Sequence, residues 1–380
     1  IDSVEISRDV IEVFNQVLYL NSAIFRKDFV MEEALVRHGV TFESAQFQGP
    51  AVFRNGDHQR STNFCRARFS NSLKFEAMKI VDFLALGTMF DGSVRFNGSV
   101  FSGRSNFGLD SLTRRENLHD VTPLHTVYKR YQGDDDAEEK LTTTKQYGVL
   151  SVNDLVARFG NSASFANVTF GKLVTFERVQ FGQSRTQMAS FYNTQFEGES
   201  HFEQSRFVGP ADFRTITANE ISFNGTRFES TWMLDDANVL GRMSLTESEF
   251  GEHANVSTYG ADISSFGIEL AQLVKNPEHS WRSKDFRLFY LQCLLSGENN
   301  KDYWEDTRLF DARWDAEREE AITDPTVIAA RVEEMCINRS IGEFTMLRDS
   351  FSGRSMLDES DWAYWHLKHY RNHQSSRYAS

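Results

Sequence analysis

Large apolar residues, most of them phenylalanine, recur along this chain at alternating steps of five and six residues. Between Phe165 and Val256 the steps are 5, 6, 5, 10, 5, 6, 5, 6, 10, 5, 6, 5, 6, 5 and 6, and a similar run extends from Phe42 to Phe107. A step of 3.6 would indicate an amphipathic helix and a step of two an ordinary strand, so the pattern fits neither. The chain therefore needs a fold in which inward-facing positions recur every five or six residues.

A second position keeps the same phase. The residue two before each large one is usually small or β-branched, as at Ala45, Ala163 and Ala211. Between these positions the chain is polar and contains turn-forming pairs such as Asn97-Gly98 and Asn224-Gly225. We therefore expect short extended segments joined by tight turns, each sending one large and one small residue inward. Coils of this kind stack about 4.8 Å apart and cover one another's apolar surface.

Three segments carry a family resemblance. FESAQFQGPAVF (42–53), SFANVTFGKLVTFERVQF (164–181) and SFYNTQFEGESHFEQSRFVGPADF (190–213) resemble the pentapeptide-repeat proteins in their Phe-centred variety, although the steps of six depart from a strict five-residue form. The resemblance implies a mainly β fold, a right-handed quadrilateral parallel β-helix, or solenoid, followed here by a small α-helical domain. At about 20 residues a coil it implies roughly eight coils.

The phase also separates core from surface. Polar positions between the inward pairs, such as Glu203, are expected to face solvent. Ten phenylalanines are assigned to the structural core: Phe47, Phe53, Phe69, Phe170, Phe176, Phe196, Phe202, Phe207, Phe213 and Phe228.

Breaks in the pattern divide the chain. Residues 1–41 are expected to be an N-terminal cap or irregular first coils, with a helix over part of them as the alternative. Coils should occupy 42–108 and 161–270, separated by an insertion at 109–160. Residues 271–380 should form an α-helical domain that covers the second end of the solenoid, since exposed strand edges must be covered or paired.

The insertion contains an acidic loop at 134–139. Clustered carboxylates suit a hard cation, but the alternating ligands and central glycine of a calcium loop are absent. A solvated loop is the favoured interpretation.

Several helices are expected in the last domain. Asp324-Pro325 should open one, because Asp is a good N-cap and Pro suits the first turn. The others are expected at 280–295, at 302–322 with Trp314 inward, at 341–353 with its end at Gly353, and at 360–371 with Ser360 or Asp358 as cap.

The last helix supplies the candidate interface. The segment 344–371 resembles the helical hairpin that follows the β-helix in bacterial pentapeptide-repeat proteins, which in some of them leads into membrane segments. Its interleaved aromatic and basic residues are typical of a membrane–water interface, and the alternative is that they form the hairpin core. The candidate interface residues are Trp362, Trp365, His366, His369, Tyr370 and Arg371.

The histidines of this helix also suit a zinc site by spacing. His369 and His373 lie four residues apart and His366 three before His369, but no HExxH carboxylate or third ligand is in place. A surface basic face is favoured, and we expect no metal and no cofactor.

Compartment and reaction class follow from what the sequence lacks. Cys65, Cys293 and Cys336 are odd in number and far apart, which favours a reducing compartment, and we expect a cytoplasmic protein, with the membrane face as its possible site. The chain has no apolar run long enough to span a bilayer. No nucleophile elbow or phosphate-binding loop is present, so we expect no enzyme.

The favoured function is a scaffold for protein–protein contacts, with a protein partner or self-association and no nucleic acid. A second expectation is that the chain is the soluble cytosolic part of a membrane-anchored protein and lies near the membrane through its C-terminus. The alternative is a DNA mimic that binds a type II topoisomerase or another DNA-binding protein, which requires an acidic rod. The chain has 41 Lys and Arg against 54 Asp and Glu, but residues 41–110 hold 6 acidic and 8 basic residues and 165–250 hold 11 and 7. The repeats are therefore not uniformly acidic.

Overall fold

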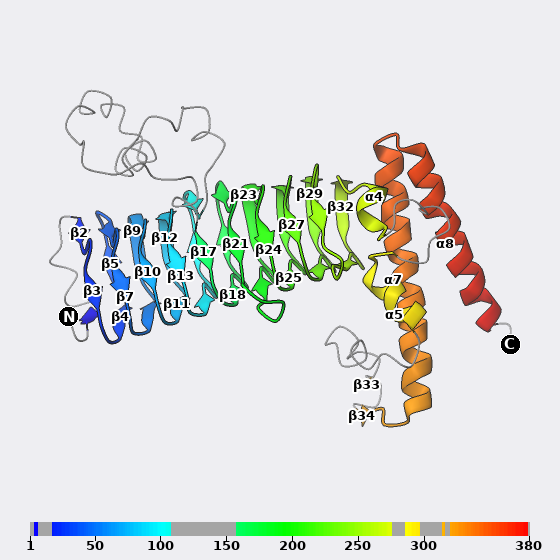
Figure 1. Ribbon diagram of the computed structural model, residues 1–380, viewed down its shortest axis with the longest axis horizontal. Coiled ribbons are helices and arrows are strands. Elements are labelled where there is room, and N and C mark those ends of the chain that lie inside the picture. Colours follow the sequence, from blue (N-terminus) through cyan, green and yellow to red (C-terminus); the bar gives the residue numbers. More distant parts are fainter. Residues whose placement is uncertain are drawn as a thin grey trace.

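The protein is a parallel β-solenoid of about nine turns, followed by a short helical region. A computed structural model describes residues 4–6, 17–107, 157–275, 286–296, 314–315 and 320–378. The coils stack into a straight rod, and the helical region lies at its C-terminal end (Figure 1). The mainly β solenoid with a following helical part, expected from the repeat, is confirmed.

Three parallel sheets run along the rod, and each is built from one or two strands per coil. Sheet A contains β1 (Val4–Ile6), β4 (Phe29–Glu32), β8 (Ala51–Arg54), β11 (Leu73–Glu76), β14 (Val94–Arg95), β18 (Ala163–Ser164), β22 (Ala189–Ser190), β25 (Ala211–Asp212), β28 (Trp232–Met233) and β31 (Val256–Ser257). Sheet B contains β2 (Leu18–Tyr19), β5 (Leu35–Val36), β6 (Val40–Thr41), β9 (Asp57–Asn63), β12 (Lys79–Leu84), β15 (Val100–Phe101), β16 (Ser105–Asn106), β19 (Thr169–Phe170), β20 (Val174–Thr175), β23 (Gln195–His201), β26 (Thr217–Ser222), β29 (Asn238–Ser244) and β32 (Asp262–Phe266). Sheet C contains β3 (Ile24–Phe25), β7 (Gln46–Phe47), β10 (Arg68–Phe69), β13 (Met89–Phe90), β17 (Arg158–Phe159), β21 (Gln180–Phe181), β24 (Arg206–Phe207), β27 (Arg227–Phe228) and β30 (Glu249–Phe250).

One coil consists of four short segments, because sheet B takes two sides. The coil of β13 to β16 shows this arrangement: β15 and β16 both pair with β12, at its two ends. Register fixes the coil length. Arg68 lies 22 residues after its partner Gln46 and 21 before its partner Met89. Two steps of five and two of six make 22, so the expectation of about 20 residues was too short.

The interior is a set of stacked phenylalanine columns. Along sheet C, nine phenylalanines from Phe25 to Phe250 form one unbroken column, with ring centroids 4.5 to 5.3 Å apart. Aromatic pairs of this kind contribute about 0.5–1.5 kcal/mol beyond their burial. All ten phenylalanines that the phase assigned to the core are at most 2% exposed.

The corners of the coils are also periodic. Ser22, Glu33, Ser44, Asn55 and Arg66 lie eleven residues apart and all have a left-handed backbone, with φ between 53° and 59°. Gly98 and Gly225, from the two turn pairs named above, have φ of 65°. Gly49 is required for a different reason, which is space. A Cβ there would lie 2.3 Å from the carbonyl carbon of Lys27 in the preceding coil. Coil spacing as well as turn conformation therefore requires glycine.

Within residues 17–41 the chain forms strands β2 to β6 and no helix, while residues 1–3 and 7–16, where the alternative also placed a helix, lie outside the described residues. These strands add a coil, which is why the solenoid has about nine turns rather than eight. The long insertion does not break the stack: β13 pairs with β17, β14 pairs with β18, and Phe90 stacks on Phe159 at 4.8 Å. The acidic loop at 134–139 lies outside the described residues.

The described helical region contains α4 (Leu270–Leu273), α5 (Phe289–Ser296), α7 (Pro325–Gly353) and α8 (Leu357–Tyr378). Asp324 caps α7 as expected, since its side chain accepts a hydrogen bond from the Thr326 amide at 2.8 Å. The helix expected at 341–353 is not separate but is the last part of α7, which ends at Gly353.

Three other helix predictions need correction. Phe286 and Leu288 are paired with Val274 and Val256, so α5 begins only at Phe289, and the N-terminal part of 280–295 that is described is extended. The last helix begins at Leu357, which places Asp358 and Ser360 inside it rather than at its cap. Within 302–322, two described segments, β33 (Trp314–Asp315) and β34 (Glu320–Ala321), form an antiparallel pair where a helix was expected, and the rest apart from Ile322 lies outside the described residues.

The helices cover the last coil, as expected from the need to protect strand edges. The Ser350 hydroxyl of α7 donates to the Phe266 carbonyl at 2.8 Å. The side-chain amide of Gln272 in α4 donates to the carbonyls of Leu245 and Ser248, at 2.9 Å each. Phe344 and Leu347 belong to the same apolar cluster as the solenoid interior. Figure 1 shows α7 crossing the end of the rod. Among the helices described, none has the length and hydrophobicity to cross a membrane.

Candidate functional site

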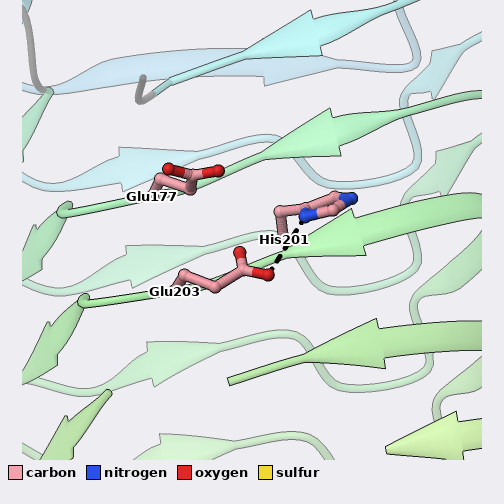
Figure 2. A group of neighbouring side chains, drawn as sticks. All are labelled: Glu177, His201 and Glu203. Atoms are coloured by element: carbon pink, nitrogen blue, oxygen red, sulfur yellow. Dashed lines mark hydrogen bonds and ion pairs between the residues drawn. The ribbon is translucent and has the colours of Figure 1, made fainter. Parts of the chain in front are cut away.

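A cluster of Glu177, His201 and Glu203 lies at the edge of sheet B, where β20 and β23 of two successive coils end and turns begin. Thr175 of β20 pairs with His201 of β23, so Glu177 and Glu203, each two residues further along the chain than these partners, occupy equivalent places one coil apart. Figure 2 shows the two carboxylates on neighbouring coils beside the imidazole of His201. One ligand atom from each residue lies within 4.8 Å of the other two.

Hydrogen bonds hold the imidazole between carboxylates. Nδ1 of His201 lies 3.1 Å from Oε1 of Glu203, and Nε2 lies 3.3 Å from Oε2 of Glu199. Glu177 is only 2% exposed, and the side chain of Glu203 is 17% exposed. The hydrogen bond to Glu203, together with the charges of the surrounding carboxylates, outweighs desolvation and raises the pKa of His201 to about 9.

Two small hollows lie along sheet B near this cluster. One holds about 90 Å³ and is lined by Glu199, Ser200, His201, Glu220, Ile221, Ser222, Arg242 and Ser244. The other holds about 180 Å³ and is lined by Gln195, Phe196, Glu197, Thr217, Ala218, Asn219, Asn238 and Leu240. Pockets for drug-sized ligands typically measure about 300–1,000 Å³. Both hollows suit ions and water rather than an organic substrate.

A second polar cluster lies between the last coils and the helices. The Tyr290 hydroxyl donates to Asp235 at 3.2 Å and accepts from Arg339 at 2.7 Å. Glu343 of α7 is fully buried and accepts from the Thr258 amide at 2.9 Å, while its Oε2 has no hydrogen-bond partner among the described residues. Burial raises the pKa of Glu343 to about 8. These contacts orient α5 and α7 on the rod, so this cluster is structural.

The structure divides the six candidate interface residues of α8 into two groups. Trp362, His366 and Tyr370 are buried against Phe344 and Phe286, as in the hairpin-core alternative. Trp365 is 59% exposed, and His369 and Arg371 are exposed as well. His369 stacks on Trp365 at 5.7 Å. At 3.6 residues per turn, the exposed Leu357, Tyr364 and Trp365 share the side of α8 that points away from the buried group.

The three histidines of α8 do not converge. His366 is buried and its pKa is lowered to about 4 by desolvation, whereas His369 and His373 are exposed. Among the described residues, one group of three or more ligand-type side chains lies close enough together to hold a metal ion. It consists of Glu177, His201 and Glu203.

Sequence reasoning missed this cluster. Glu203 was assigned to solvent, but it contacts His201 and is largely covered. The coil that separates Glu177 from Glu203 has 26 residues rather than 22, so counting along the repeat did not align them. The signal that could have aligned them is the phenylalanine phase, which resumes at Phe191 after a step of ten and places Phe202, the residue between His201 and Glu203, one coil after Phe176.

Cys65, Cys293 and Cys336 are buried, and none of them forms a disulfide. Comparisons with protein-family models, with curated proteins and with solved structures return no match for this chain.

Proposed function

We propose that this chain is a non-enzymatic pentapeptide-repeat scaffold that binds a partner protein through the outward side of α8. One observation carries the proposal: Leu357, Tyr364 and Trp365 are 70%, 51% and 59% exposed on one side of a helix whose other side is firmly packed. Aromatic side chains on a rigid support are the usual anchors of protein interfaces.

The charges of α8 favour a protein over a lipid surface as the occupant. Asp358, Glu359 and Asp361 lie in its first turns, and Lys368 and Arg371 further along. Anionic lipid would be repelled by the first group, whereas a protein surface can complement both signs. The three buried cysteines, none of which forms a disulfide, support a reducing compartment such as the cytoplasm.

DNA mimicry is the weaker proposal. Acidic side chains on the coils pair with arginines of neighbouring coils, as in Arg54–Glu76 at 3.0 Å, Arg68–Asp91 at 2.7 Å and Arg206–Glu229 at 2.7 Å. Such pairs cancel the single-sign field that imitation of a phosphate backbone requires.

The test is site-specific photo-crosslinking in the cells that produce the protein. A crosslinker in place of Trp365 should capture a partner that the same crosslinker in place of Tyr19, 70% exposed near the other end of the rod, does not. The identified partner is then purified, and its Kd is measured against the wild type, the double variant Tyr364→Ala/Trp365→Ala and the control Tyr19→Ala.

The double variant should bind at least about tenfold more weakly, as for loss of interface anchors, with Tyr19→Ala unchanged. Unchanged affinity in the double variant would exclude α8 as the interface. Flotation of the wild type but not the double variant with anionic vesicles would assign α8 to the membrane instead. Turnover of any substrate that a single polar substitution abolishes would overturn the non-enzymatic assignment.

A further inference from the structure

We propose that Glu177, His201 and Glu203 bind one divalent transition-metal ion, with Zn²⁺ as the best match, and so link two successive coils of the solenoid. The site is independent of the proposed partner surface on α8, which lies in the helical region beyond the last coil.

The ligand set fits Zn²⁺ in type and spacing. One imidazole and two carboxylates are borderline and hard donors, whereas Ca²⁺ and Mg²⁺ prefer oxygen alone. A tetrahedral ion with bonds of about 2.0–2.2 Å places its ligands about 3.3–3.6 Å apart. The three ligand atoms here already lie within 4.8 Å of one another, so small side-chain rotations bring them to that separation. The fourth position remains for water.

Glu199 orients the imidazole as a metal-binding histidine is usually oriented. Such histidines donate the N–H of one ring nitrogen to a carboxylate, which leaves the other nitrogen for the metal. Nε2 of His201 faces Glu199 at 3.3 Å, and Nδ1 faces Glu203 at 3.1 Å. Glu199 is therefore a positioning residue, and Nδ1 is the nitrogen that we assign to the ion.

The local charge and the covered oxygens also favour a cation. Glu177, Glu199, Glu203 and Glu220 bring four carboxylates to the cluster and the adjoining hollow. Oε2 of Glu203 is buried, and no donor among the described residues reaches it. A buried carboxylate oxygen without a donor is costly, and a bound cation removes that cost.

The competing interpretation is an ion pair of His201 with its glutamates and nothing more. The two interpretations differ in what they predict for added metal, because an ion pair alone has no affinity for Zn²⁺. The exposed His369 and His373 lie four residues apart on α8 and can bind Zn²⁺ as a pair. The test is therefore made in a His369→Gln/His373→Gln background, so that they contribute no signal.

The experiment is calorimetric titration of this background protein with Zn²⁺ at pH 8, followed by His201→Gln, Glu203→Gln and Glu177→Gln added singly. We expect one equivalent of Zn²⁺, and at least about tenfold weaker binding in each of the three variants. Glu199→Gln should weaken binding by about tenfold while the stoichiometry stays at one. His253→Gln, which removes an exposed histidine of another coil, is the matched control and should leave the Kd unchanged.

Two further measurements separate a lost site from a lost fold. Melting of each variant without metal reports whether it folds, and Zn²⁺ should raise the Tm of the background protein but not of His201→Gln. Co²⁺ should give the intense visible absorption of a low-coordinate site, and His201→Gln should lose it. No binding up to about 1 mM Zn²⁺, or binding that His201→Gln and Glu203→Gln leave intact while folded, would overturn the proposal.

Discussion

The solenoid and the helical region bury their apolar residues in different ways. In the solenoid one contact is repeated: each phenylalanine of a column stacks on its equivalent one coil away, as Phe181 does on Phe207 at 4.6 Å. In the helical region each contact is made once. Phe344 packs against His366 and Tyr370, at 5.0 and 5.8 Å, and the buried Glu343 joins α7 to Thr258.

This difference predicts how each region responds to change. Because the same contact recurs in every coil, the loss of one leaves the others in place. For the same reason the contact does not specify at which coil the rod ends. A unique contact selects one arrangement of helices and coil, and the end of the rod depends on it.

The largest effect should come from removing the helical region. A chain of residues 1–270 exposes the edges of β31 and β32 and the apolar residues that Phe344 and Leu347 cover. Because uncovered parallel strands pair with other chains, we expect end-to-end association or aggregation. Sedimentation velocity measures this, and a monodisperse monomer of 1–270 would show that the rod ends without help.

A single column residue should have the next largest effect. Phe207→Ala removes a ring stacked between Phe181 and Phe228 and should lower the free energy of unfolding by about 3–5 kcal/mol. Urea denaturation measures the loss. The exposed Glu197→Gln in the preceding strand is the control and should change stability by less than about 0.5 kcal/mol. Equal stability of the two variants would contradict the inward position of Phe207.

Glu343 should make the helical contact sensitive to pH. Its pKa in the folded protein is about 8, against 4.5 in the unfolded chain, because burial disfavours the charged carboxylate. Its contribution to stability is therefore complete below pH 4.5 and is lost as pH rises toward 8. In that window the free energy of unfolding should fall by about 1.4 kcal/mol per pH unit from this group.

The matched variant is Glu343→Gln, which keeps an acceptor for the Thr258 amide and cannot ionise. Urea denaturation at about pH 5, 7 and 9 should show the variant gaining on the wild type as pH rises. Parallel pH profiles of the two proteins would mean that Glu343 is not buried in the folded state.

The smallest effect should come from the outward side of α8. Trp365→Ala should change the free energy of unfolding by less than about 0.5 kcal/mol, because Trp365 is 59% exposed. Trp362→Ala, three residues away and 1% exposed, should cost about 3–5 kcal/mol. Thermal melting of this pair tests the two sides of the helix, and a comparable loss in both would place Trp365 in the core.

Much of the solenoid could be predicted because its signal is repeated. A single phenylalanine says little, but steps of five and six over many coils specify which residues point inward, and all ten assigned phenylalanines lie in the interior. The insertion after Phe107 did not obscure this, since Phe159 rejoins the column of Phe90. Coil number was less well predicted, because the strands before residue 42 carry fewer phenylalanines.

The helix boundaries and the candidate metal cluster depend on partners that are remote in sequence. Phe286 and Leu288 have helical spacing with the residues that follow, but pairing with Val274 and Val256 draws them into extended structure. Glu177 and His201 meet because their coils are neighbours, although the connection between them departs from the usual coil length. Neither contact leaves a local pattern.

The sequence alone determined the coil, its inward residues and the change from strands to helices, because each is a short-range pattern of side-chain size and polarity. Where α7 docks, which side of α8 remains exposed and which carboxylates surround His201 depend instead on tertiary packing. Those features arise where segments far apart in the chain pack together, and the free energy of such contacts depends on burial and charge that no local period records.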